Sequence, residues 1–284
     1  MKMNDKFTIA YYIYNKGPFV KKIVECARQY DGIPLIFLFD GCTDDSVAQF
    51  QSCRSGLKNC RVFVNQPHDL FETLCNNFIL ETFETESCVL CQDDLLPNDT
   101  KYLDLAIKIQ NEDPDTGLIG FKDGFEMSLV NSYDAMISAP WSFSKSRRQV
   151  LEAGEFVQRT FVNRGPLLVN KRVIERIGLF DRRFVPMFWD DNDYCLRAVL
   201  AGFHNYVAFS DVECKPEWGA TRGGSKIPCK KIFLANEVRF GRKWNMPMPK
   251  QYPLKVISAF LASLRIQWAS RVRSAFSLFV PKEI

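Results

Sequence analysis

Short apolar runs alternate along the first 120 residues with stretches in which apolar side chains recur every three or four positions. The runs are typical of strands buried on both faces, and the recurring positions are typical of helices. This alternation predicts an α/β fold, a mainly parallel sheet with helices on both faces. The predicted strands are Phe7–Tyr14, Ile33–Phe39, Arg61–Asn65, Ser87–Cys91 and Leu118–Phe121.

The helices between these strands begin at residues that suit a helix start. Pro18 fits a first helical turn, and Thr43 or Asp44 can cap the helix after the second strand. Another helix is expected to open at Pro97-Asn98-Asp99 and to run to about residue 109. The other predicted helices are Leu70–Phe83, Lys171–Ile177, Asp191–Ala201 and Leu254–Phe279.

Three segments of the second half are less regular. Residues 122–164 look loop-rich with short helices, and fit an insertion over an active site. Asn205–Phe209 is predicted as a strand, and the Gly and Pro content of 214–229 predicts a loop.

Polar side chains follow three of the predicted strands at the point where each strand ends. These are Tyr14-Asn15, Asp40 and Gln92-Asp93-Asp94. Because the carboxyl ends of parallel strands meet at one edge of a sheet, where ligands bind, these groups are expected to converge on a site.

Asp93 and Asp94 have two interpretations. Carboxylates at the end of an apolar strand are costly to bury unless they are paired. Mg²⁺ or Mn²⁺ on a diphosphate would pair with them, since these metals prefer hard oxygen ligands. The alternative is an Asx turn that caps the helix expected at Pro97.

Two other segments carry candidate chemistry. Asp40 precedes Gly41, and its carboxylate can accept from a base N–H or a ribose hydroxyl, or can form the turn. Phe188 and Trp189 stand before three acids, which suits a sugar ring against an aromatic wall and an acceptor hydroxyl beside a base. Acidic charge at a helix start is the alternative for those acids.

Several other kinds of site are disfavoured. No Gly-x-Gly-x-x-Gly follows the first strand and no P-loop occurs, so dinucleotide binding of the Rossmann type is not expected. The only histidines, His68 and His204, have no plausible nucleophile beside them. A Ser-His-Asp or zinc site is therefore not expected.

The composition indicates the cellular compartment and a basic C-terminal segment. The ten cysteines are scattered and are expected to be reduced thiols in a cytoplasmic protein. Residues 215–284 hold 14 Lys and Arg against 3 Asp and Glu. The helix expected at 254–279 is basic with one apolar face, so it can lie on an anionic membrane surface or pack on another part of the protein. No apolar run approaches the roughly 20 residues of a membrane span.

Four segments, in order, resemble motifs of the inverting family 2 glycosyltransferases of GT-A fold, of the type that builds bacterial surface polysaccharides. Asn76, seventeen residues before Asp93, also matches an Asn often found in that family. The four segments are Thr8–Lys16, Phe39–Ser46, Cys91–Pro97 and Gly165–Arg197, the last ending in Asp190-Asp191-Asn192-Asp193-Tyr194-Cys195-Leu196-Arg197.

The resemblance implies transfer of a sugar, with inversion, from a nucleoside-diphosphate sugar to a glycan or lipid-linked acceptor. It also implies Mg²⁺ or Mn²⁺ as cofactor, and no nucleic-acid partner is expected. Arg164 and Arg222 are basic candidates for the phosphates. The implied roles are nucleotide binding by Tyr12, Asn15, Asp40, Asn76 and Asp93, metal binding by Asp93 and Asp94, acceptor binding by Trp189 and Asp190, and base catalysis by Asp191.

The resemblance divides the chain into a catalytic domain, 1–212, and a basic extension, 213–284. The domain has a nucleotide-binding half, 1–121, and an acceptor half, 122–212. Phe39 and Cys91 replace aspartates of the family motifs, and the late histidine near the metal is missing. Two other functions therefore stay open: an inactive sugar- or nucleotide-binding module, and a nucleotidyltransferase.

Overall fold

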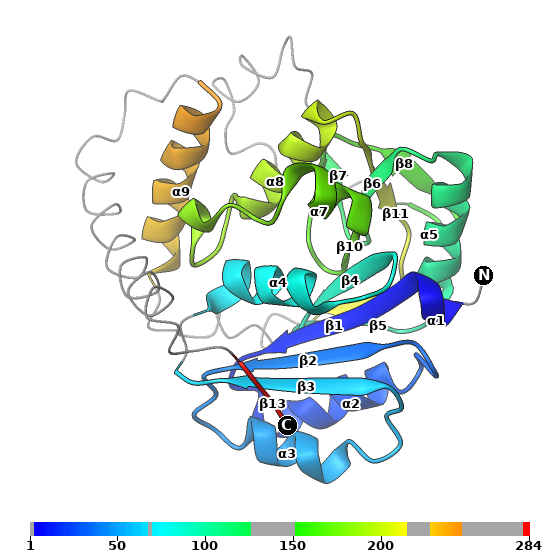
Figure 1. The fold of residues 1–284 in the computed structure, drawn as a ribbon, viewed down its shortest axis with the longest axis vertical. Helices are drawn as coiled ribbons and strands as arrows, with labels where there is room; N and C mark the ends of the chain where they lie inside the picture. Colours follow the sequence, from blue (N-terminus) through cyan, green and yellow to red (C-terminus); the bar gives the residue numbers. More distant parts are fainter. Residues whose placement is uncertain (1–2, 68–69, 126–150, 215–227, 246–280) are drawn as a thin grey trace.

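The structure, a computed structural model, describes residues 3–67, 70–125, 151–214, 228–245 and 281–284. Within them a nine-stranded sheet has the order β13-β3-β2-β1-β4-β10-β6-β11-β8 (Figure 1). Its strands are β1 (Phe7–Ile13), β2 (Leu35–Asp40), β3 (Cys60–Asn65), β4 (Ser87–Gln92), β6 (Thr116–Gly120), β8 (Phe156–Gln158), β10 (Leu167–Asn170), β11 (His204–Ala208) and β13 (Lys282–Glu283).

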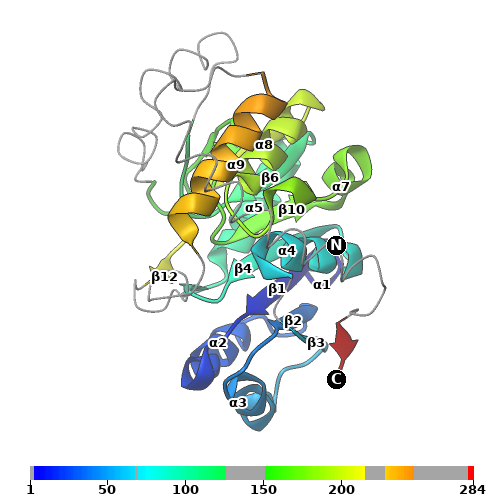
Figure 2. The same cartoon turned by 90° about the vertical axis from the view of Figure 1, so that its left-hand side faces the viewer.

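Helices cover both faces of this sheet, as predicted (Figures 1 and 2). One core contains side chains of α2 (Val20–Ala27), α3 (Ser46–Cys53) and α5 (Lys101–Glu112). The other contains side chains of α4 (Phe71–Thr82), α7 (Lys171–Ile177), α8 (Asp190–Leu200) and α9 (Cys229–Lys243). The short helices are α1 (Met3–Lys6), η1 (Gly17–Phe19) and η3 (Arg182–Phe184).

Strand β1 shows why its sequence is a continuous apolar run. Phe7, Ile9, Tyr11 and Ile13 enter the core beneath α2 and α3, whereas Ala10 enters the core beneath α4. Alternate side chains of a strand point to opposite faces, so a strand covered on both faces needs apolar residues at almost every position. The parallel block β3-β2-β1-β4 follows from this burial.

Strand β10 was not predicted. It is antiparallel to both neighbours, pairing Leu168 with Val89 of β4 and with Ile119 of β6. Four residues are too few to show a periodic pattern, which is why the sequence gives no signal there. The strand joins the first half of the sheet to the second.

The start of α5 differs from the prediction. Leu95–Pro97 is a short strand, β5, that pairs with β12 (Val212–Cys214), so no helix opens at Pro97. The helix begins at Lys101, whose backbone N–H donates to Asp99 Oδ1 at 3.0 Å. Buried leucines before the proline hold this segment extended.

The described parts of the segment expected to be loop-rich contain strands. Besides β8 there are β7 (Gly124–Phe125) and β9 (Phe161–Val162), which pair with each other. Residues 126–150 of the expected insertion lie outside the described residues, as do 215–227 of the expected loop and the helix expected at 254–279.

Two elements are described after residue 227. Helix α9 was not predicted, although Ile232, Ala235 and Phe240 are buried along one side of it. Strand β13 pairs with β3, and Glu283 accepts from Arg61 Nε at 2.9 Å, so the chain returns to the sheet edge (Figure 2). In the described part of the chain, no helix is long and apolar enough to span a bilayer. The side chains of nine of the ten cysteines are described, and none of these nine is in a disulfide.

Candidate active site

The ends of β1 and β4 meet through Asp93, as predicted. Asp93 Oδ1 lies 3.0 Å from Lys16 Nζ, and Asp93 Oδ2 accepts from the backbone N–H of Tyr14 at 3.2 Å. Burial raises the pKa of Asp93 to about 6; the Lys16 ammonium opposes this rise and the neighbouring Asp94 adds to it. The carboxylate has a cationic partner that lies 77 residues earlier in the chain.

Asp94 is half-buried and pairs with no cation in the described part of the chain. In the described ranges, no group of three or more His, Cys, Asp or Glu side chains is arranged so that it could hold a metal ion. Mg²⁺ and Mn²⁺ are commonly held by one or two carboxylates plus substrate phosphates. The pair Asp93-Asp94 therefore fits a metal that arrives with a diphosphate and does not form a complete site of its own.

Asn15 links the ends of β1 and β2. Its Oδ1 accepts from the backbone N–H of Thr43 at 2.8 Å, and its Nδ2 donates to Thr43 Oγ1 at 3.2 Å. Both ends of the amide are used, and Asn15 itself has a left-handed backbone with φ 49°. Asn15 thus fixes the loop that carries Lys16 toward Asp93.

Asp40 is 2% exposed, and its carboxylate is bonded within the protein. Asn65 Nδ2 donates to Oδ1 at 2.7 Å, and the backbone N–H of Phe71 donates to Oδ2 at 2.8 Å. Direct contact with a nucleotide base, expected from the motif, does not fit this burial. In this structure Asp40 holds the start of α4.

Asn76 lies on α4 with 0% exposure, so the expected contact with the nucleotide does not fit its position either. Neither amide atom of Asn76 has a hydrogen-bond partner among the described residues. Tyr12, in contrast, is partly exposed, and its hydroxyl donates to Glu72 Oε1 at 2.7 Å. Tyr12, at the end of β1, therefore reaches the surface beside the site, and nucleotide binding by Tyr12 stays a prediction.

Arg164 joins the strand ends to the start of α8. Its two terminal nitrogens donate to the carboxylate of Asp190 at 3.0 and 2.8 Å, and Thr73 Oγ1 donates to Asp190 Oδ2 at 2.8 Å. Asp190 is 0% exposed, so acceptor binding by Asp190 is corrected to a partnership with Arg164. Because both terminal nitrogens of Arg164 donate to Asp190, Arg164 is not available to bind phosphates. Arg222 lies outside the described residues.

Asp191 keeps an accessible carboxylate. Its side chain is 17% exposed and lies 3.6 Å from Arg164 Nε. Burial raises its pKa to about 6, with Arg164 opposing the rise and Asp190 and Glu72 adding to it. A carboxylate with a pKa near neutrality that reaches solvent can accept a proton from a hydroxyl.

Glu72, on the first turn of α4, is a site residue that the sequence analysis missed. Its Oε1 accepts from Tyr12 and from Gln92 Nε2, both at 2.7 Å, and lies 3.5 Å from Arg164 Nε. It therefore connects the end of β4 to Asp191. An acid in a first helical turn is usual, so its sequence position gave no signal.

Trp189 is only partly an open aromatic wall. Its ring packs on Phe240 and Phe233 of α9, with centroid separations of 5.0 and 5.6 Å. The indole N–H is buried and has no hydrogen-bond partner among the described residues. Trp189 also has a left-handed backbone, with φ 66°.

Comparisons with known proteins place the fold. No family model matches the chain, and no curated protein matches it. Residues 1–349 of TarS from S. aureus superpose with a TM-score of 0.53 at 14% identity, over 93% of this chain and 80% of that one. The structure of TarS 1–349 in complex with UDP-GlcNAc gives 0.51 at 13% identity, over 94% and 88%.

GalNAc-T7, solved with UDP, GalNAc and Mn²⁺, superposes with a TM-score of 0.58 at 11% identity, over 85% of this chain and 48% of that one. The chain also spans about half of a longer TarS structure, 49% of it. At these identities the likeness shows the fold alone. The chain has the GT-A fold expected from its motifs.

Proposed function

We propose that this chain is a nucleotide-sugar-dependent glycosyltransferase. The observation that carries the proposal is one connected site at the ends of β4 and α8. Gln92, next to Asp93-Asp94, bonds to Glu72, and Glu72 and Asp191 both lie beside Arg164. One end offers carboxylates to a metal diphosphate, and the other offers a base of raised pKa. The GT-A fold is consistent with this arrangement, since structures sharing it contain UDP-GlcNAc or UDP, GalNAc and Mn²⁺.

The proposed reaction is a single displacement with inversion. An acceptor oxygen bonds to the anomeric carbon as the bond from that carbon to the diphosphate oxygen breaks, and the hydroxyl proton passes to Asp191. Bound Mg²⁺ or Mn²⁺ would neutralise the charge on the departing nucleoside diphosphate. Lys16 fixes Asp93, and Arg164 orients Asp190 and Asp191.

The proposed acceptor is a hydroxyl of a glycan or of a lipid-linked sugar, as in assembly of a surface polysaccharide. The resemblance of the sequence motifs supports this class. We place the enzyme in the cytoplasm, with the basic segment 254–279 as the part that would contact an anionic membrane.

Product analysis tests the proposal. The protein is incubated with UDP-glucose, UDP-galactose and their N-acetylamino counterparts, with Mn²⁺ or Mg²⁺, and released nucleotide is measured. Nucleoside diphosphate is expected from this mixture. A parallel incubation supplies a nucleoside triphosphate and a sugar phosphate instead, and release of pyrophosphate there would identify a nucleotidyltransferase. Binding of UDP-sugars without any hydrolysis or transfer would leave an inactive binding module and overturn the proposal.

A further inference from the structure

The residues just before Asp190 and Asp191 have an unusual backbone. Phe188 and Trp189 are both left-handed, with φ 72° and 66°. Residues with a Cβ rarely adopt this conformation, and two in succession need surrounding structure to hold them. We call this pair the left-handed turn. Its geometry sets where α8 begins and where its first carboxylates point.

Asn236 of α9 bonds to the backbone on the amino-terminal side of this turn. Its Nδ2 donates to the carbonyls of Phe184, Met187 and Phe188 at 2.6, 2.7 and 3.1 Å. Asn236 is 0% exposed, so no water replaces these bonds readily. Its Oδ1 accepts from Arg239 Nη1, which fixes the amide with its N–H groups toward the turn.

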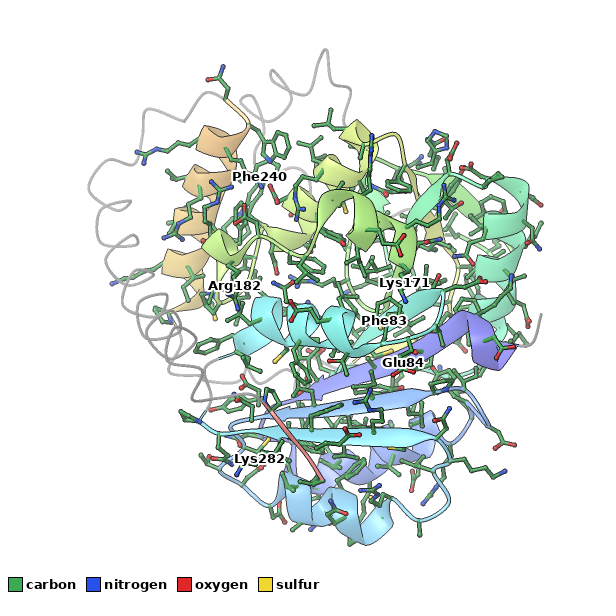
Figure 3. The ribbon with its side chains drawn as sticks, viewed as in Figure 1. Phe83, Glu84, Lys171, Arg182, Phe240 and Lys282 are labelled. Carbon is green, nitrogen blue, oxygen red and sulfur yellow. The ribbon has the colours of Figure 1, made fainter. Side chains whose placement is uncertain are left out.

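The same helix holds the carboxyl-terminal side of the turn. Phe240 packs against the ring of Trp189, and Figure 3 shows it on the side of α9 that faces α8. One helical turn into α8, the buried Asp193 accepts from Lys243 Nζ at 2.6 Å and from Trp244 Nε1 at 3.1 Å. Helix α9 therefore contacts the left-handed turn on both sides.

We propose that Asn236 is a positioning residue for the proposed transfer reaction, because it holds the left-handed turn that sets the carboxylate of Asp191 in the site. This inference rests on the proposed function. Asn236 does not contact the ligand; it acts through Phe188 and Trp189. If the amide is lost, the buried carbonyls of Phe184 and Met187 and the partly buried carbonyl of Phe188 lose a donor, and the turn can relax toward a right-handed backbone.

The test compares Asn236→Ala with Asn205→Ala in the full chain. Asn205 is also fully buried, and its Nδ2 donates to the carbonyls of Thr160 and of Cys195, which lies in α8 six residues after the left-handed turn. Both variants are expected to lose thermal stability. Only Asn236→Ala is expected to lose kcat, by about 10²-fold, the scale for a misplaced catalytic group. Its affinity for UDP, measured by calorimetry, is expected to be unchanged.

A pH–rate profile separates positioning from stability. Burial raises the pKa of Asp191. A relaxed turn that admits water is expected to lower this pKa. The acid limb of the profile, where kcat falls as Asp191 is protonated, then moves to lower pH. A folded Asn236→Ala protein with wild-type kcat and an unmoved acid limb would overturn the inference, as would an equal loss of kcat in Asn205→Ala.

A second variant keeps the test decisive if Asn236→Ala does not fold. Arg239→Met frees the Asn236 amide to rotate and leaves the asparagine in place. It is expected to lower kcat less, with the acid limb moving in the same direction; no change in either quantity overturns the inference. If wild-type protein consumes no sugar nucleotide, it is the proposed function that fails, which is a distinguishable result.

Discussion

Asp190 and Asp191 are neighbours in the sequence with opposite environments. The first is fully buried on Arg164 and Thr73, and the second keeps 17% of its side chain exposed. The resemblance implied that Asp191 is the base and that Asp190 binds the acceptor, with acidic charge at a helix start as the alternative for these acids. The sequence did not show that Arg164 binds the carboxylate of Asp190 and leaves that of Asp191 partly exposed, because Arg164 lies 26 residues before Asp190.

This difference predicts a separation of activity from stability. Asp191→Asn is expected to lower turnover by about 10² or more with little change in Tm or UDP affinity. Asp190→Asn is expected to cost about 3–5 kcal/mol of folding free energy, because it leaves Arg164 without its bidentate partner. Turnover and urea unfolding of both variants check this. A larger turnover loss in folded Asp190→Asn would assign the base to Asp190.

The raised pKa of Asp191 predicts a pH dependence. The carboxylate must be ionised to accept a proton, so kcat is expected to be constant above neutrality and to fall as the pH drops through about 6. Asp93 also has a pKa raised to about 6, so Asp93→Asn is the comparison. An acid limb that persists in Asp93→Asn belongs to Asp191, and one that disappears belongs to Asp93.

Asp94 is the strand-end carboxylate without a described cationic partner, which predicts a metal role. Asp94→Ala is expected to remove most turnover and to abolish the Mn²⁺-dependent rise in Tm that a nucleoside diphosphate gives wild-type protein. Asp104→Ala, at an exposed position of α5, is the matched control and should behave as wild type. A wild-type metal response in Asp94→Ala would leave the residue a structural role.

At the scale of elements, the sequence predicted the parallel strands and most helices, because continuous burial and helical spacing are local signals. It missed α9 and β5. Both elements depend on partners that are distant in the sequence. Helix α9 packs on Trp189 and on α8, and β5 pairs with β12. The candidate site was predicted for the strand ends and for Asp191, but not for Glu72 or the burial of Asp40.

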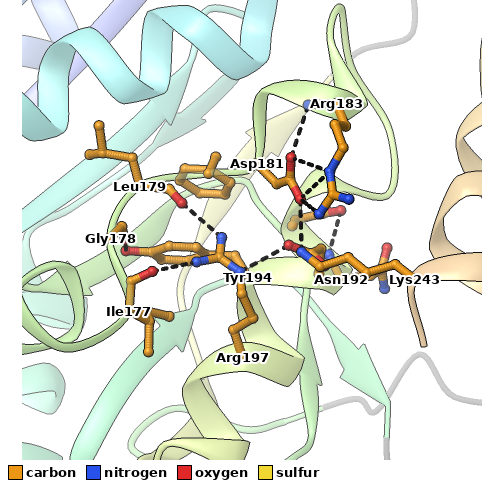
Figure 4. A network of polar contacts seen from close by, with 12 residues as sticks. Ile177, Gly178, Leu179, Asp181, Arg183, Asn192, Tyr194, Arg197 and Lys243 are labelled. Carbon is orange, nitrogen blue, oxygen red and sulfur yellow. Dashed lines mark hydrogen bonds and ion pairs between the residues drawn. The ribbon is translucent and has the colours of Figure 1, made fainter.

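The docking of α9 on α8 predicts a stability effect. Lys243 bonds to Asp193 and to Asp181 at 2.6 and 2.8 Å (Figure 4). Lys243→Met is expected to cost about 1–3 kcal/mol in urea unfolding at pH 7, the scale for a charged hydrogen bond lost in a buried site. Lys58→Met, which removes an exposed pair with Asp31, is expected to cost less than about 1 kcal/mol.

The effect of Lys243→Met should fade in acid. Burial alone would raise the pKa of Asp181, but hydrogen bonds from Arg183 and Lys243 lower it below its usual range. A lowered pKa gives stability that is complete above the unfolded value of about 3.9 and is lost as the pH falls through the lower pKa of the folded state. A cost of Lys243→Met that does not shrink between pH 7 and about pH 2 would contradict this account.

At the scale of the whole molecule, the described chain leaves at α9 and returns as β13 on the edge of β3. The segment between them contains the basic stretch expected to be amphipathic. On the membrane proposal, full-length protein sediments with vesicles containing phosphatidylserine at low salt, and this binding weakens as salt is added. Vesicles of phosphatidylcholine alone are the control. No sedimentation at low salt would rule the proposal out.

Strand β10 has a consequence for the order of folding. It enters between β4 and β6, so its hydrogen bonds join residues 77 to 83 positions apart on one side and about 50 apart on the other. Such distant pairings form late, because loop closure costs entropy before the contacts repay it. The pairings of β1 with β2 and of β2 with β3 span only 25 or 26 positions and can form first. The pairing of β4 with β1 spans 80 positions, so β4 is unpaired on both sides until its distant partners arrive. During that interval an unpaired edge of β4 is the point at which two folding chains would join by mistake.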